Sequence, residues 1–314
     1  MSKPQILQVG SYPAWDQTPL DAQFTMHRYF DAADKHAFLA THGPAIRAIA
    51  TRGDLGADAG MIAACPNLEL IAVYGVGYDA VHLPSARARD IPVTNTPDVL
   101  TDDVADLAVG MILALSRGIN LAEAFVRDRS WAKASFPLQR KVSGRRAGIL
   151  GLGRIGYQIA RRLEAFGMPI SYHSRQPKPG AERWTYVADP VELARRSDYY
   201  VVALAATAET RHIVSCDVIA ALGPNGTIVN ISRAANIDEA ALLDALESGA
   251  LGGAALDVFD GEPALNHRFL TAPNTLLQPH HGSGTFETRQ AMGQLMRDNL
   301  TAHFAGLPLL TPIV

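Results

Sequence analysis

The sequence predicts an α/β protein of two doubly wound domains, each with a parallel sheet covered by helices. Three observations carry this prediction. Short apolar runs alternate with helical stretches along the chain, a glycine-rich turn joins a strand to a helix at 151–156, and a second glycine turn follows an apolar run at 75–77. With 314 residues, the chain is long enough for two domains with separate cores.

The first part of the chain, residues 5–97, predicts a small parallel sheet with helices such as 32–40 between its strands. The expected strands are 5–9, 46–50, 70–74 and 92–95. Gly75, Val76 and Gly77 follow the strand 70–74, where exposed backbone N–H groups form an anion nest. They are therefore candidate carboxylate binders, and the alternative is a plain turn in which glycine supplies a positive φ.

A long helix is expected from Thr101 to Leu115, with Thr101 as its N-cap and two aspartates complementing the helix dipole. Its position before a second α/β unit suggests that it bridges two domains. Residues 119–145 contain no clear strand. They either extend across a partner subunit or form a surface loop, and the sequence leaves both open.

Residues 146–167 predict a dinucleotide site in a Rossmann domain, because a strand, a glycine turn and a helix follow one another. Gly151 allows the tight turn, and Gly153 lets the backbone approach a pyrophosphate closely. Gly156 lets the helix pack closely against the strand. The pyrophosphate would lie at the helix N-terminus. The candidate cofactor contacts in this turn are Gly151, Gly153, Arg154, Ile155 and Gly156. The alternative is a glycine-rich turn of another α/β sheet.

The end of the next strand predicts which dinucleotide is bound. NAD sites usually have an acid there, but this chain has His173, Ser174 and Arg175. A guanidinium beside a hydroxyl suits the 2′-phosphate of NADP(H). We therefore expect NADP(H) to be preferred, with NAD(H) possible and with Ser174 and Arg175 as phosphate ligands. The alternative is that Arg175 is a solvated surface arginine.

Six strands are expected in the second domain, separated by helices such as 238–247, and a last helix runs from about 285 to 306. Domain boundaries are accordingly expected at 1–99 with 285–314 for the substrate domain, and at 100–284 for the dinucleotide-binding domain.

The composition describes a globular chain with 48% hydrophobic residues and a net charge of −3. No basic stripe or polybasic segment points to nucleic acid or a membrane surface. Cys65 and Cys216 are far apart and are expected to be buried thiols in a reducing compartment. No signal sequence is evident, so the cytoplasm is the expected location.

Three polar side chains, Arg233, Glu262 and His280, fall at the expected ends of strands in the second domain. Reduction of a 2-keto acid by hydride transfer needs a proton donor, a cation for the carboxylate, and a partner that keeps the donor protonated. These three residue types meet those needs, because a carboxylate beside an imidazole favours the imidazolium form. Each one alone has an ordinary structural explanation, and the hypothesis rests on their joint placement.

These motifs together resemble the D-isomer-specific 2-hydroxyacid dehydrogenase family over almost the whole chain. The matching segments are 74–79, 95–106, 151–156, 209–212, 230–233, 255–263 and 279–283. The resemblance implies a Rossmann domain inserted in a flavodoxin-like substrate domain. Residues 141–144, 173–175 and 308–314 resemble the NADP-preferring glyoxylate, hydroxypyruvate and hydroxyphenylpyruvate reductases.

The resemblance also implies roles. Arg233 would bind the substrate's carboxylate and carbonyl, and Glu262 would pair with His280, the general acid and base. Val76 and Gly77 would hold the carboxylate through their N–H groups, and Asp257 would contact the nicotinamide carboxamide. The segment 119–145 resembles the dimerisation arm of the family, which implies a homodimer. No metal site is expected, because no third ligand accompanies His280 and His281.

Two other kinds of protein remain open. Relatives of this fold serve as cofactor-sensing binding proteins, and others oxidise formate or phosphonate. The side chain of the substrate is also open, because aromatic residues at loop positions either line a pocket or pack locally. These aromatic residues are Tyr12, Trp15, Tyr78, Trp131 and Phe136.

Overall fold

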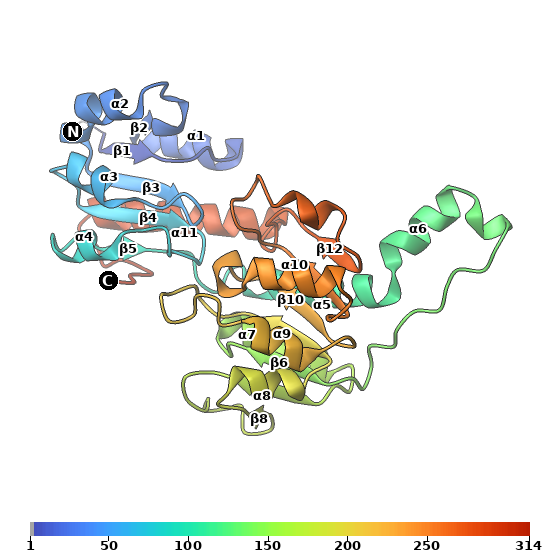
Figure 1. Ribbon diagram of the computed structural model, residues 1–314. Coiled ribbons are helices and arrows are strands. Elements are labelled where there is room, and N and C mark those ends of the chain that lie inside the picture. Colours follow the sequence, from blue (N-terminus) through green and yellow to red (C-terminus); the bar gives the residue numbers. More distant parts are fainter. Residues whose placement is uncertain (1–2) are drawn as a thin grey trace. The chain divides into compact units, whose positions relative to one another are not determined.

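The computed structural model describes residues 3–314, which separate into two compact units (Figure 1). The first unit comprises Met1–Leu100 and Ser283–Val314, and the second is Thr101–Gly282. Each unit contains one wholly parallel sheet, so the predicted fold class of two parallel-sheet α/β domains is confirmed.

The first unit has a five-stranded sheet in the order β2-β1-β3-β4-β5. The strands are β1 (Gln5–Gln8), β2 (Thr25–Arg28), β3 (Ala48–Arg52), β4 (Leu70–Tyr74) and β5 (Val93–Thr94). Four of these were expected, and β2 was missed. Its sequence, Thr-Met-His-Arg, carries no apolar run, because it is an edge strand and none of its residues is fully buried.

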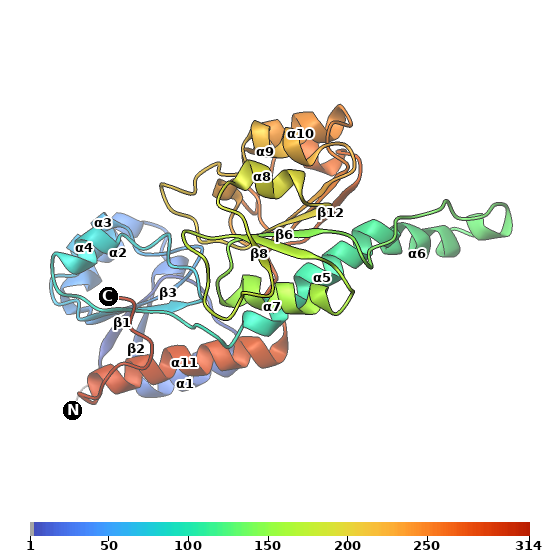
Figure 2. The ribbon, with the colours of Figure 1, turned by 90° about the horizontal axis from the view of Figure 1, so that it is seen from below.

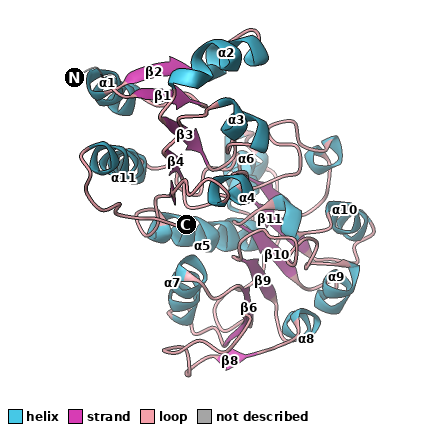
Figure 3. Ribbon diagram, turned by 90° about the vertical axis from the view of Figure 1, so that its left-hand side faces the viewer, coloured by secondary structure: helices cyan, strands magenta, loops and turns pink. Residues whose placement is uncertain are grey.

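Two helix layers cover this sheet. Helices α1 (Ala14–Gln23) and α11 (Phe286–Phe304) lie side by side on one face, and three shorter helices cover the other (Figures 2 and 3). These are α2 (Lys35–His42), α3 (Ala59–Ala64) and α4 (Leu83–Arg87). A buried ion pair between Asp16 and Arg297 joins α1 to α11, and Gly293 leaves room for the carboxylate. The last helix therefore belongs to the first unit.

The second unit has a seven-stranded sheet in the order β12-β11-β10-β9-β6-β7-β8. Its strands are β6 (Ala147–Leu150), β7 (Ile170–His173), β8 (Thr185–Tyr186), β9 (Tyr199–Val202), β10 (Thr227–Asn230), β11 (Gly253–Leu256) and β12 (Thr275–Leu277). The expectation of six strands was wrong, because β8 is a two-residue edge strand that no sequence pattern marks.

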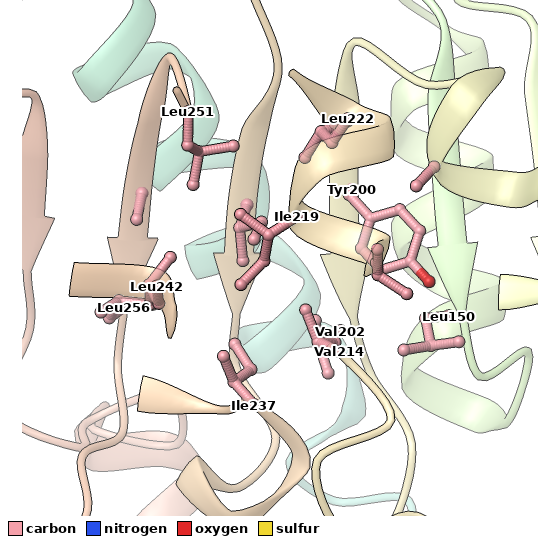
Figure 4. Packing of buried hydrophobic residues seen from close by; sticks show 14 of the residues in the cluster. Leu150, Tyr200, Val202, Val214, Ile219, Leu222, Ile237, Leu242, Leu251 and Leu256 are labelled. Carbon is pink, nitrogen blue, oxygen red and sulfur yellow. The ribbon is translucent and has the colours of Figure 1, made fainter. Parts of the chain in front are cut away.

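Helices cover both faces of this sheet, with α5 (Thr101–Arg117) and α7 (Arg154–Glu164) on one side (Figure 2). The other side carries α8 (Pro190–Arg195), α9 (Cys216–Leu222) and α10 (Glu239–Glu247). Between this layer and the strands lies an apolar core that includes Tyr200, Ile219 and Leu242 (Figure 4). This packing fixes the strand ends from which the site residues emerge.

The segment 119–145 begins with an additional helix, α6 (Ile119–Arg127), which extends away from the seven-stranded sheet (Figure 1). It follows Gly118, whose φ of +58° allows the chain to bend by 56° after α5. Several large apolar side chains here are exposed, among them Leu121 at 69% and Trp131 at 68%. Among residues 3–314, no single helix is long and apolar enough to cross a membrane, although α5 and α6 taken together pass that test by length and composition.

Both cysteines are free thiols, and Cys65 is buried as expected. Cys216 is exposed, which corrects the expectation that it lies in the core. It occupies the first position of α9, where the side chain faces solvent instead of the sheet.

Candidate active site

The glycine turn of the second unit connects β6 to α7 with the geometry that an anion site needs. Gly151 has φ +101°, and a Cβ there would lie 2.7 Å from the backbone nitrogen of Leu204. A Cβ on Gly156 would clash with the carbonyl oxygen of Gly151, so the helix packs directly on the turn. Gly153 is the N-cap of α7 and has open space around it. The first N–H groups of a helix point along its axis toward the residues before it, so this open N-terminus is the kind of place where an anion binds.

The residues expected to read the cofactor's phosphate lie at the end of β7. Ser174 is 9% exposed, and its hydroxyl donates to the carbonyl oxygen of Gln176 at 2.5 Å. Arg175 is exposed. The pKa of Glu209 is lowered first by a hydrogen bond with the Thr207 side chain, then by one with its own backbone, and to a smaller extent by the charge of Arg175. Arg175 therefore lies within electrostatic reach of the loop after β9, and its charge is available at the surface.

His280 and Glu262 form a direct pair. Nδ1 of His280 contacts Oε1 of Glu262, and the other carboxylate oxygen accepts the N–H of Phe259 at 3.1 Å. Burial raises the pKa of Glu262, but the hydrogen bond and charge of His280 outweigh this, so the pKa lies below its ordinary value. Because the carboxylate accepts at Nδ1, Nε2 is left for another partner.

Arg233 follows β10 in a turn that is held by asparagines. Asn230 accepts the N–H and hydroxyl of Ser232 at 3.0 and 2.8 Å and donates to the Arg233 carbonyl at 3.1 Å. Asn236 is fully buried and donates to Leu204 and Ser232, both at 3.1 Å. The charge of Arg233 contributes to the lowered pKa of Glu262. The structure thus brings Arg233, Glu262 and His280 together at one edge of the sheet.

Asp257 has a structural task that sequence reasoning did not assign. It is 2% exposed, and its two oxygens accept the N–H groups of His281 and Gly282, both at 2.9 Å. Burial raises its pKa despite these bonds. The two bonds hold the loop in which His280 takes a positive φ of 51°. A histidine in this conformation is uncommon, and the surrounding structure must maintain it.

The glycine turn of the first unit follows β4. Gly75 has φ +146°, and its N–H donates to Oγ1 of Thr96 at 3.1 Å. Its carbonyl oxygen accepts the N–H of Thr96 at 2.9 Å, and Asn95 donates to the carbonyl of Val76 at 2.8 Å. Among residues 3–314, the N–H groups of Val76 and Gly77 donate to no acceptor. Thr96 was missed by sequence reasoning, because its partner is 21 residues away.

Most aromatic residues considered as a pocket lining have local packing partners. Tyr12 is 9% exposed and contacts the ring of Tyr74 at 5.5 Å. Trp15 packs edge-on against Phe286 at 6.0 Å. Phe136 packs on Phe125 at 5.4 Å, and Tyr78 packs against the apolar core of the first unit, whereas Trp131 is exposed. In the described part of the chain, no group of three or more His, Cys, Asp or Glu side chains could hold a metal ion.

A glycine turn opening onto a helix N-terminus, on a parallel sheet wound on both faces, defines the class of dinucleotide-binding α/β proteins. Residues 109–282 match the model of the D-isomer specific 2-hydroxyacid dehydrogenase, NAD binding domain. The chain belongs to the D-isomer specific 2-hydroxyacid dehydrogenase family and is an oxidoreductase.

Similar proteins of nearly the same length include two reductases and a 2-hydroxyacid dehydrogenase. The chain is 49% identical to hydroxyphenylpyruvate reductase of Plectranthus scutellarioides over 309 residues, which cover 98% of each chain. The crystallised 2-hydroxyacid dehydrogenase of Ketogulonicigenium vulgare Y25 is similar with 65% identity and a TM-score of 0.94, over 100% of this chain and 99% of the other. The NADPH-dependent glyoxylate/hydroxypyruvate reductase of Sinorhizobium meliloti, in complex with NADP and malonate, shares 40% identity with a TM-score of 0.92, over 100% and 97% of the two chains.

Proposed function

We propose that the protein reduces small 2-keto acids, such as glyoxylate and hydroxypyruvate, to D-2-hydroxy acids with NADPH. The observation that carries this proposal is the pair of His280 and Glu262 beside Arg233 on the same sheet edge as the dinucleotide turn. The similar glyoxylate/hydroxypyruvate reductase supports the substrate class. Phenylpyruvates are included because of the similar hydroxyphenylpyruvate reductase.

His280 is proposed as the general acid. Glu262 accepts at Nδ1 of the imidazole, so Nε2 carries the proton toward the carbonyl oxygen of the substrate. The carboxylate of Glu262 holds the imidazole ring through Nδ1, which directs Nε2 to the substrate. In the reverse direction, neutral Nε2 accepts the proton of the hydroxyl group. A positioned group of this kind contributes typically about 10²–10⁴ in rate.

Two groups are proposed to hold the substrate's carboxylate. The guanidinium of Arg233 offers forked donors that match a carboxylate and a polarised carbonyl oxygen. The N–H groups of Val76 and Gly77 supply further donors, while Gly75 contributes through backbone conformation because its N–H already donates to Thr96. Orientation of the carboxylate then determines which face of the carbonyl is reduced.

The cofactor is proposed to bind at the turn Gly151–Gly156, with its pyrophosphate at the N-terminus of α7, where Gly153 has open space around it. When bound, NADPH supplies the hydride for the carbonyl carbon. Arg175 is proposed to bind the 2′-phosphate, and Ser174 would have to turn its hydroxyl away from Gln176 to join it. Asp257 is proposed to contribute by holding the His280 loop, in addition to the expected carboxamide contact.

The test is NADPH oxidation at neutral pH with glyoxylate, hydroxypyruvate and phenylpyruvate, using wild type and His280→Ala. We expect turnover with at least one acid, and a loss of about 10²–10⁴ in kcat for His280→Ala with unchanged NADPH affinity. Tight NADPH binding without turnover of any keto acid would support a cofactor-sensing binding protein instead. If the protein reduces NADP⁺ with formate or phosphonate and turns over no keto acid, it is a dehydrogenase of those anions.

The cofactor preference has its own test. Arg175→Asp is expected to lower kcat/KM for NADPH by at least about tenfold while that for NADH stays constant or rises, since an acid repels the 2′-phosphate. Lys178→Asp introduces the same charge change at an exposed position of the same loop and is the matched control. Equal NADPH/NADH ratios for the two variants would remove Arg175 from the site.

We also propose that the chain forms a homodimer through residues 119–145. The exposed apolar side chains of this segment support a partner surface, because monomers rarely expose such groups together. They are Ile119, Leu121, Val126, Trp131 and Leu138. Sedimentation of wild type and Leu121→Asp should give a dimer and a monomer respectively, and a monomeric wild type would contradict the proposal.

A further inference from the structure

An ion pair lies beside the glycine turn of the first unit. Nε and Nη2 of Arg52, the last residue of β3, donate to the two carboxylate oxygens of Asp54 at 3.0 and 2.7 Å. Arg52 pairs in register with Tyr74, which directly precedes Gly75. The backbone nitrogen of Gly53 lies 3.5 Å from the position of a Cβ on Gly75. The ion pair and the turn are therefore neighbours at the carboxyl edge of the same sheet.

The position of Arg52 is fixed at both ends of its side chain. A Cβ on Gly10 would lie 3.0 Å from Cδ of Arg52 and 2.6 Å from Cδ1 of Leu55, so the aliphatic part of Arg52 packs on the bare backbone of Gly10. The two-point bond to Asp54 fixes the plane of the guanidinium. The side chains remain 42% and 33% exposed, which leaves donors of Arg52 and lone pairs of Asp54 accessible.

We propose that Arg52 and Asp54 recognise a hydroxyl group on carbon 3 of the 2-keto acid, so that the preferred substrates are hydroxylated keto acids. This rests on the proposed function, in which Val76 and Gly77 hold the carboxylate. A hydroxyl group both donates and accepts, and it can bond to the carboxylate and the guanidinium at once. An alkyl or aryl group in the same place would remove water from the pair without replacing its hydrogen bonds.

The paired charges also exclude another substrate class. The carboxylate of Asp54 neutralises Arg52, so a second carboxylate on the substrate gains little from the cation and is repelled by the acid. Because the pair is neutral as a whole but rich in donors and acceptors, it selects polar, uncharged substituents. The local packing of Tyr12 and Trp15 agrees with this choice over an aromatic side chain.

The first test is Arg52→Met, which keeps the aliphatic part of the side chain on Gly10. We expect kcat/KM for hydroxypyruvate to fall about tenfold to hundredfold, the range for a charge-assisted hydrogen bond. Glyoxylate has no carbon 3, so its kcat/KM should stay within about twofold. An equal fall for both acids, or no fall for either, would overturn the proposal.

Arg47→Met is the matched control. Arg47 forms a similar two-point pair with Glu69 at 2.7 and 2.8 Å, with side chains 46% and 38% exposed, immediately before β3 begins. It is therefore at the opposite end of the same strand. We expect the ratio of the two kcat/KM values to be unchanged in this variant, and a shifted ratio would show that the effect at Arg52 is not local.

The second test is Asp54→Asn, which leaves the charge of Arg52 without its counter-ion. We expect kcat/KM for oxaloacetate to rise at least about fivefold relative to hydroxypyruvate, because its second carboxylate now meets an uncompensated cation. An unchanged ratio would overturn the charge argument. If the wild type turns over no keto acid, the proposed function itself is wrong. If the wild type is active and Arg52→Met lowers kcat/KM equally for hydroxypyruvate and glyoxylate, only the present proposal is wrong.

Discussion

The two glycine turns of this protein follow buried parallel strands in the same way, yet they differ in what comes next. The turn after β6 opens directly onto α7, whose N-terminal residue Arg154 follows Gly153. The turn after β4 leads to no immediate helix, and one of its N–H groups donates to Thr96. A helix start binds anions through several aligned donors, while the second turn offers two N–H groups.

The carboxyl-end edges of the two sheets also differ in their polar side chains. The seven-stranded sheet carries an imidazole paired to a carboxylate, which can move a proton, and the five-stranded sheet carries a neutral ion pair, which can only recognise a partner. We therefore expect substitutions at the first edge to change kcat and cofactor binding. Substitutions at the second should change KM and selectivity.

The largest expected effect tests the proton-transfer edge. Glu262→Gln removes the carboxylate that accepts at Nδ1 of His280 and holds the ring, so kcat at neutral pH should fall about a hundredfold while NADPH affinity is unchanged. Glu239→Gln is the control, because this neighbouring carboxylate accepts the N–H of Asp260 and no imidazole. A kcat for Glu262→Gln equal to that of the control would break the assignment of chemistry to this edge.

Two alanine substitutions in the turn after β6, at Gly153 and Gly156, separate the effect on cofactor binding from the effect on packing. Gly153→Ala places its Cβ in open space, so the melting temperature should be nearly unchanged while the Kd of NADPH rises at least about tenfold. Gly156→Ala clashes with the Gly151 carbonyl and should lower stability by about 1–3 kcal/mol as well. Calorimetry and NADPH titration measure both quantities. Equal NADPH affinity for Gly153→Ala and wild type would refute the pyrophosphate site.

A smaller effect is expected at the substrate turn. Thr96→Val removes the acceptor of the Gly75 N–H and should raise KM for glyoxylate about fivefold to tenfold with little change in kcat, the range for one hydrogen bond. Thr94→Val, at a buried position of β5, is the control. A fall in kcat with constant KM would contradict the division of roles between the two edges.

The smallest effect concerns stability at acid pH. The pKa of Glu262 is lowered in the folded protein, so its contribution to stability is complete above the ordinary glutamate value of about 4.3 and is lost as the pH falls through the folded pKa. Wild type should therefore lose more melting temperature than Glu262→Gln when the pH is lowered from about 5 to about 3. Identical losses would mean that His280 does not stabilise this carboxylate.

The sequence by itself determined the order of buried strands, the dinucleotide turn and the long helix at Thr101. It also predicted that Arg233, Glu262 and His280 share an edge. Most of these features are local, because residues a few positions apart determine a strand, a helix cap or a glycine turn. The shared edge follows because the carboxyl ends of parallel strands lie on the same side of a sheet. The exposure of Cys216 and the helix α6 show the limit of such patterns, since each depends on which face finds a partner.

Only the tertiary structure decided the features that join distant residues. The edge strands β2 and β8 exist because a neighbouring strand supplies their hydrogen bonds, and their own residues carry little signal. Thr96 holds Gly75, Asp257 holds the loop of His280, and Asp16 meets Arg297 across 281 positions. A buried polar group needs a partner of matching geometry, and the folded chain alone determines which residue arrives there.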